Sequence, residues 1–258
     1  MNKQQIGEVW AMLDRERLAG VAMRGPEPVF ATISGAHLYG FASPDSDIDL
    51  RGAFLTPAAE VLGLNPPPET ISIDEKTDIE LDWVAHDLRK FARLMTKHNG
   101  YCLEQLYSPL VVVTNPIHEE LMELGKGCIT RLTARHCLGF ANSRFKRLSE
   151  PNPTVKHLLY AYRVLLTGIR LMKTGEVVAN IEVLNQEFNL SQINELVERK
   201  RTGAEKMPLA ESELDIHITE LHALVEQLNK AQAESSLPDE PQTIDELNEF
   251  VVRVRLNR

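Results

Sequence analysis

The spacing of apolar and polar positions changes along this chain, and the change divides it near residue 115. In the first part, apolar runs and alternating positions predict strands at residues 29–34, 47–55, 70–74, 78–84 and 110–113. Helical spacing predicts an opening amphipathic helix at residues 3–23 and shorter helices at 88–97 and 101–107. The first part therefore reads as a small sheet with helices between its strands.

The second part has the spacing of helices from Pro116 onward. A long helix is expected at residues 155–174, and Gly175 fits its C-cap. Two further helices are expected at 214–232 and 244–256. The second of these follows Thr243, which has the spacing of a capping box with the glutamate three residues later.

Together these patterns predict an α+β protein, with a small mixed-sheet N-terminal domain at residues 1–115 and a helical C-terminal domain at 116–258. Of the 258 residues, 43% are hydrophobic and 25% charged, which is typical of a globular protein. No apolar run approaches the ~20 residues of a membrane span, so we expect a cytoplasmic protein without a membrane partner. The three cysteines are widely spaced, which favours buried free thiols over zinc ligands or disulfides.

Charge is distributed unevenly within a net charge of −9. Residues 129–175 contain nine lysines and arginines and one acidic residue, whereas residues 207–250 contain eleven acidic residues and one lysine. One interpretation is that the basic stretch serves an anion such as a nucleotide or RNA. The other is a solvated basic face balanced by the acidic region.

A candidate site begins at a turn rich in small residues, 35–40, and continues into a strand that contains Asp47 and Asp49. Side chains two apart on a strand share a face, so both carboxylates are expected on one side, opposite the apolar Ile48 and Leu50. Two such carboxylates favour a bound cation, for which Mg²⁺ is the usual partner alongside substrate phosphates. A glycine turn lets backbone N–H groups approach those phosphates.

Three further acids, Asp78, Glu80 and Asp82, alternate on the strand predicted at 78–84. If that strand neighbours the Asp47–Asp49 strand, one of them completes a three-carboxylate site that can hold two Mg²⁺ ions. The alternative is that these acids form ion pairs with arginine or lysine.

These motifs resemble the polymerase-β-like nucleotidyltransferase superfamily, and more narrowly a group of nucleotidyltransferases that includes RNA-repair-associated members. That group has a Gly-Ser-Arg-x-Tyr-Gly turn, then Ser-Asp-x-Asp with an Arg-Gly soon after, which correspond here to residues 35–40 and 46–52. Its third carboxylate precedes an Asp-Leu-Arg-Lys helix start, matched by residues 87–90, which selects Asp82. Its Asn-x4-Glu-x-Leu-x-Ser-Pro pattern is present at 99–109.

The resemblance implies a nucleotidyltransferase fold and a Mg²⁺-dependent transfer from a nucleoside triphosphate to a hydroxyl, with an RNA end as the favoured acceptor. It implies that metal binding and catalysis rest on Asp47, Asp49 and Asp82. The residues implied in nucleotide binding are Gly35, Ala36, His37, Tyr39, Gly40, Ser46, Arg51, Lys156, Tyr160 and Arg163. For Arg51, two roles stay open, namely holding the carboxylates and contacting a phosphate.

Two positions depart from the group's pattern. Ala36 lacks the hydroxyl of the usual serine, and His37 replaces an arginine with a side chain that is mostly neutral near pH 7. These departures favour an alternative function, a non-catalytic nucleotide- or partner-binding protein on the same fold. A third interpretation is a structural module whose acids only form ion pairs.

Overall fold

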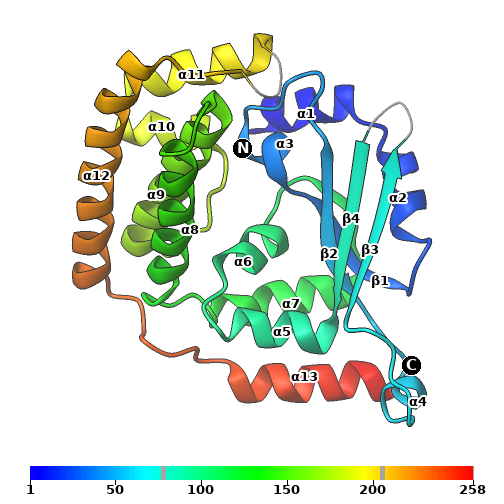
Figure 1. Cartoon of the computed structure of the whole chain (residues 1–258). Coiled ribbons are helices and arrows are strands. Elements are labelled where there is room, and N and C mark those ends of the chain that lie inside the picture. Colours follow the sequence, from blue (N-terminus) through cyan, green and yellow to red (C-terminus); the bar gives the residue numbers. More distant parts are fainter. Residues whose placement is uncertain (77–79, 204–206, 258) are drawn as a thin grey trace. The chain divides into compact units, whose positions relative to one another are not determined.

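A computed structural model describes residues 1–76, 80–203 and 207–257 (Figure 1). Its contacts group the chain into two units. The first contains Met1–His37, Asp47–Ile129 and Glu240–Arg258, and the second contains Leu38–Ser46 and Thr130–Asp239. The expected domain boundary after residue 115 stays a prediction, because grouping by contacts does not test whether either part folds alone.

The first unit contains a mixed sheet, which confirms the expected α+β class. Among the described residues its strand order is β3-β4-β2-β1-β5. Of the strand pairs in the described residues, β2 and β4 are parallel, and the other neighbouring strands are antiparallel. The bounds are β1 Pro28–Ile33, β2 Ile48–Phe54, β3 Thr70–Lys76, β4 Glu80–Asp87 and β5 Val111–Val113. The expected start of the fourth strand at Asp78 lies outside the described residues.

Along the chain, helices precede, separate and follow these strands. They are α1 Lys3–Met12, α2 Arg15–Ala22, α3 Gly35–Tyr39, α4 Ala58–Val61, α5 Leu88–Met95, α6 Gly100–Leu106, α7 Pro116–Lys126 and α13 Ile244–Leu256. The single helix expected at 3–23 is wrong, because Asp14 interrupts it and caps α2 by accepting from the Arg17 N–H at 3.0 Å. The segment that starts at Gly35 also differs from the prediction, because it forms the short helix α3 where a small-residue turn was expected.

Close packing between β1, β2 and β4 explains one motif glycine. A Cβ at Gly52 would lie 2.0 Å from the Phe30 carbonyl oxygen and 3.0 Å from the Trp83 ring. Phe30 and Trp83 are both fully buried. The glycine of the Arg-Gly pair therefore serves strand packing in the core.

The second unit is helical, with α8 Thr133–Leu148, α9 Val155–Thr174, α10 Ile181–Phe188, α11 Ser191–Thr202 and α12 Glu211–Glu234. Helix α9 has the predicted bounds and ends at Gly175 with φ 71°, a left-handed conformation that glycine adopts without strain. Helices α10 and α11 were not predicted. None of the helices in the described residues is long and apolar enough to cross a membrane.

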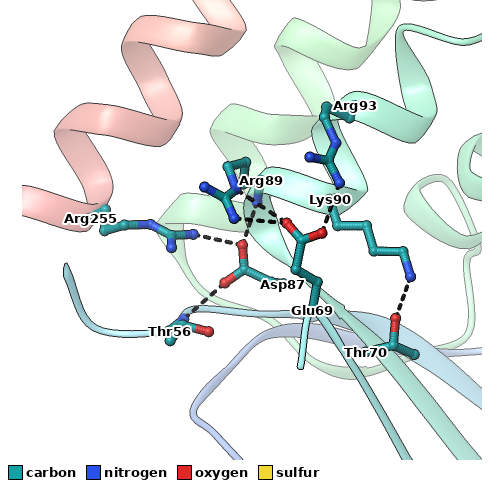
Figure 2. Close-up of polar contacts among 8 residues, drawn as sticks. All are labelled: Thr56, Glu69, Thr70, Asp87, Arg89, Lys90, Arg93 and Arg255. Carbon is teal, nitrogen blue, oxygen red and sulfur yellow. Dashed lines mark hydrogen bonds and ion pairs between the residues drawn. The ribbon is translucent and has the colours of Figure 1, made fainter. Parts of the chain in front are cut away.

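Asp87 connects β4, α5 and the C-terminal helix α13 (Figure 2). One carboxylate oxygen, Oδ1, accepts from the Arg89 backbone N–H at 2.9 Å and from Arg255 Nη2 at 2.7 Å, and Oδ2 accepts from the Thr56 N–H at 3.2 Å. Burial alone would raise the pKa of Asp87, but these hydrogen bonds and the charge of Arg255 lower it. The ionised carboxylate therefore anchors α13 to the end of β4.

Glu69 lies beside Asp87 and forms exposed ion pairs with Arg89 and Arg93 (Figure 2).

The capping box expected at the start of α13 is wrong. Thr243 makes no side-chain cap, and its hydroxyl instead donates to the Leu124 carbonyl at 2.8 Å.

The cysteine prediction is confirmed. Cys102, Cys128 and Cys137 are buried free thiols. Burial raises the pKa of Cys102 to about 12, which keeps its thiol protonated.

Candidate active site

The parallel pairing of β2 with β4 brings two of the predicted carboxylates together. Asp49 on β2 is the register partner of Asp82 on β4. Both side chains are partly exposed, at 30% and 39%, whereas Ile48 and Leu50 are buried on the other face. The adjacency of the two strands, on which the three-carboxylate site depended, is thus present, and the roles assigned to the carboxylates stay predictions.

Arg51 lies between these two carboxylates. Its Nη2 donates to Asp49 Oδ1 at 2.6 Å and to Asp82 Oδ2 at 2.8 Å. Its Nη1 donates to the carbonyls of Leu50 at 2.8 Å and Asp82 at 2.6 Å. Arg51 therefore contacts two of the predicted carboxylates, and its expected role in nucleotide binding stays a prediction.

Tyr101 on α6 also contacts this guanidinium through a hydrogen bond. Burial alone would lower the pKa of Arg51, but Tyr101, Asp49 and Asp82 outweigh it and raise the pKa. Sequence reasoning missed Tyr101, because the contact joins α6 to β2 and no local pattern predicts it.

Gly35 allows the start of α3 to approach the Asp49 carboxylate. Its φ is 61°, and a Cβ at this position would lie 1.9 Å from Asp49 Oδ2. The Ser34 N–H also donates to the Asp49 carbonyl at 2.8 Å. Ala36 and His37 follow with side chains only 5% and 7% exposed, so a role for them in nucleotide binding would rest on their backbone groups.

Asp47 directly precedes β2 and is exposed. Asp47, Asp49 and Asp82 have carboxylate oxygens, the donors that Mg²⁺ prefers. Arg51 takes one oxygen of each paired carboxylate, and in the described residues no three histidine, cysteine or acidic side chains are arranged to hold a metal ion. The donor atoms are of the kind that Mg²⁺ prefers, but Arg51 contacts both Asp49 and Asp82, and a magnesium site here stays a prediction.

The remaining predicted residues belong to the second unit. Arg163 is 2% exposed, and its guanidinium lies 3.9 Å from the centre of the Tyr39 ring, which is itself buried. Arg201 Nη2 donates a hydrogen bond to the Gly40 carbonyl at 2.6 Å. Lys156 and Tyr160 are both half-buried on α9.

Ser46 shapes the loop before β2. The Ser43 N–H donates to the Ser46 hydroxyl at 3.0 Å, and the two hydroxyls lie 3.0 Å apart. The fully buried Lys200 donates to the Ser43 hydroxyl at 2.5 Å. Sequence reasoning missed Lys200 because the helix that positions it, α11, was itself not predicted.

The downstream motif at 99–109 serves the fold of the first unit. The Asn99 side chain caps α6 by accepting from the Tyr101 and Cys102 N–H groups. Ser108 donates to the Ile33 carbonyl at 2.7 Å, which ties the end of α6 to β1. Glu104, between them, is buried.

A mixed sheet with carboxylates on two adjacent strands and a glycine at close approach is the arrangement expected of a polymerase-β-like nucleotidyltransferase. The sequence model of the RNA repair pathway DNA polymerase beta family matches residues 14–253, and the chain belongs to this family.

Two relatives are similar in sequence. Uncharacterized protein MJ0002 of Methanocaldococcus jannaschii is 33% identical over 156 residues, which are 58% of this chain and 62% of that protein. Uncharacterized protein YcgL of Bacillus subtilis is 26% identical over 211 residues, 78% of each chain. A solved nucleotidyltransferase-like protein from Exiguobacterium sibiricum is 12% identical, covers 99% of this chain and 80% of its own, and has a TM-score of 0.29.

Proposed function

We propose that this protein transfers a nucleotidyl group from a nucleoside triphosphate to a hydroxyl acceptor, favouring an RNA end, and releases pyrophosphate. The observation that supports this most is the register of β2 and β4, which sets Asp49 opposite Asp82 beside Gly35. The family match over residues 14–253 agrees with this class of reaction.

In the proposed reaction, the acceptor hydroxyl oxygen forms a bond to the α-phosphorus as the bond from that phosphorus to the pyrophosphate oxygen breaks. Asp82 receives the hydroxyl proton or orients the hydroxyl, and its partly exposed side chain leaves room for an acceptor. The Gly35–Gly40 segment presents backbone N–H groups to the phosphates. Asp47, Asp49 and Asp82 would hold Mg²⁺, which when bound neutralises phosphate charge and lowers the pKa of the hydroxyl.

The test compares pyrophosphate release by Asp82→Asn and Glu80→Gln. Each of the four ribonucleoside triphosphates is supplied with Mg²⁺ and single-stranded RNA. Glu80 lies on the same strand two residues earlier and is exposed, so its substitution removes a neighbouring carboxylate as a matched control. We expect Asp82→Asn to lower the rate of pyrophosphate release at least about a hundredfold, which is the scale of a lost general base. Glu80→Gln should change that rate little. Equal activity of both variants and the parent would contradict the role of Asp82.

A second candidate is a nucleotide-binding protein without transfer activity. The position of Arg51 between Asp49 and Asp82 supports it, because the guanidinium already compensates both carboxylates. The departures at Ala36 and His37 agree with it. This candidate predicts triphosphate binding with no pyrophosphate release by the parent protein, a result that the same assay would give directly.

A further inference from the structure

Helices α8 and α9 of the second unit present aromatic rings and basic groups in alternation. We define the aromatic–basic cluster as Phe140, Arg144 and Arg147 on α8 and Lys156, His157 and Tyr160 on α9. The rings of Phe140 and Tyr160 are stacked, with centroids 6.3 Å apart and planes 22° from parallel. Both residues are half-buried.

Basic groups lie directly against these rings. The Arg144 guanidinium is 4.8 Å from the Phe140 centroid and 5.9 Å from that of Tyr160. The Lys156 ammonium is 5.9 Å from the Tyr160 centroid. A guanidinium packed against rings in this way is restricted in orientation and keeps its charge.

Buried aromatic side chains support the cluster from within the same unit. Tyr160 makes edge contacts with Tyr39 at 5.6 Å and with Phe41 at 5.4 Å between centroids. Tyr39 and Phe41 are 2% and 0% exposed. The Tyr160 ring is therefore held firmly, which lowers the ordering cost of a ligand that stacks nearby.

The electrostatic environment of the cluster is positive. Burial and then the charges of Arg144, Arg147 and Lys156 lower the pKa of His157. Glu150, which pairs with Arg147 at 2.9 Å, is the acidic group among the charges that act on His157. Arg144 forms no ion pair with any described residue, and its Nε is buried without a hydrogen-bond partner there.

We propose that the aromatic–basic cluster binds single-stranded RNA, with bases stacking on the Phe140 and Tyr160 rings and phosphates pairing with Arg144, Arg147 and Lys156. Aromatic rings beside cations suit single-stranded nucleic acid, because each base can stack on a ring and each phosphate can pair with a cation. The inference rests on the proposed function, because an RNA end is the acceptor that the proposed function favours. Arg163 is buried against Tyr39 beneath this surface, and its expected part in nucleotide binding stays a prediction.

The test measures binding rather than transfer, so it does not depend on catalysis. The full chain is titrated into a fluorescein-labelled 12-nucleotide single-stranded RNA in EDTA, and anisotropy is read at several KCl concentrations. The variants are Phe140→Leu, Arg144→Gln and Arg147→Gln. Arg135→Gln is the matched control, because Arg135 is an exposed arginine on the same helix outside the cluster.

We expect Phe140→Leu to weaken binding at least fivefold with the salt slope unchanged, because it removes stacking and no charge. Arg144→Gln and Arg147→Gln should weaken binding and each reduce the slope of log K against log salt by about 0.7, the value for one phosphate contact. Arg135→Gln should change affinity less than twofold. Equal losses with Arg135→Gln, or equal binding of a duplex of the same sequence, would overturn the inference.

A second measurement covers variants that fold poorly. A 4-thiouridine-containing RNA is crosslinked to the parent protein, and crosslinks are expected in the peptides that contain Phe140 and Tyr160. Crosslinks elsewhere, or displacement of RNA by polyglutamate as efficiently as by unlabelled RNA, would overturn the inference. RNA binding at the cluster without pyrophosphate release would leave the inference standing and contradict the proposed function alone, whereas transfer to another acceptor without RNA binding would do the reverse.

Discussion

Gly35 is the residue at which backbone conformation and the candidate site meet. A Gly35→Ala substitution places a methyl group against the Asp49 carboxylate at a positive φ. We expect a loss of about 2 kcal/mol or more of unfolding free energy, from backbone strain and displacement of Asp49. Gly20→Ala in α2 is the control, since a Cβ there meets nothing within 4 Å, and it should stabilise by about 0.5–1 kcal/mol.

Urea unfolding of the parent and the two glycine variants checks this prediction. Equal stability of Gly35→Ala and the parent would show that the start of α3 can move away from Asp49 at little cost.

Arg51 compensates two neighbouring carboxylates, and its removal should make the protein depend on another cation. Without it, Asp49 and Asp82 face each other as like charges on adjacent strands. We expect Arg51→Ala to lower stability by about 2 kcal/mol in EDTA, the scale of lost charged hydrogen bonds. Mg²⁺ should then raise its melting temperature more than that of the parent.

The control for Arg51 is the double variant Arg51→Ala/Asp49→Asn, which removes one of the two facing charges. It should recover part of the stability in EDTA and lose the extra response to Mg²⁺. A response to Mg²⁺ that is the same in all three proteins would contradict competition between Arg51 and an ion.

At the scale of elements, the ion pair of Asp87 with Arg255 fixes the C-terminal helix α13 to β4 and α5. The two side chains are 3% and 10% exposed, so removing one charge leaves the other buried without its partner. Asp87→Asn should therefore lower the unfolding free energy by about 3 kcal/mol. Glu69→Gln, which breaks an exposed pair nearby, should cost less than about 1 kcal/mol.

The same pair predicts a pH dependence. The pKa of Asp87 is lowered in the folded protein, so its contribution is complete above the unfolded value of about 3.9 and is lost as pH falls through the folded pKa. Chemical denaturation between pH 7 and pH 3 should show a smaller acid-induced loss for Asp87→Asn than for the parent. If both proteins lose the same unfolding free energy on acidification, the Asp87–Arg255 ion pair contributes no pH-dependent stability.

At the scale of the whole molecule, nucleotide binding should appear as thermal stabilisation. A nucleoside triphosphate with Mg²⁺ at about 100 times its dissociation constant stabilises by about 2.7 kcal/mol. For a chain of this size, the melting temperature should rise by roughly 5 °C or more. EDTA should abolish the shift, and Asp49→Asn/Asp82→Asn should lack it in Mg²⁺. A shift that persists in EDTA would contradict a metal-dependent site.

Local patterns predicted much of the secondary structure because they depend on neighbours in sequence. Alternation predicted the two strands that contain Asp49 and Asp82, and helical spacing with a terminal glycine predicted α9. Prediction failed where tertiary contacts outweigh local preference. Thr243 bonds to the Leu124 carbonyl instead of capping its own helix, and the segment at Gly35 forms a helical turn against Asp49.

By itself, the sequence determined the α+β class, the motif that places the chain in its family, and the face of β2 that carries Asp49, opposite the buried Ile48 and Leu50. It could not determine what lies between the carboxylates of β2 and β4. The position of Arg51 depends on strand register and on contacts from β4 and α6, which join residues far apart in the chain. Burial of Arg163 under Tyr39, and the meeting of Phe140 with Tyr160, were likewise decided only by tertiary packing, because each contact joins separate segments of the chain.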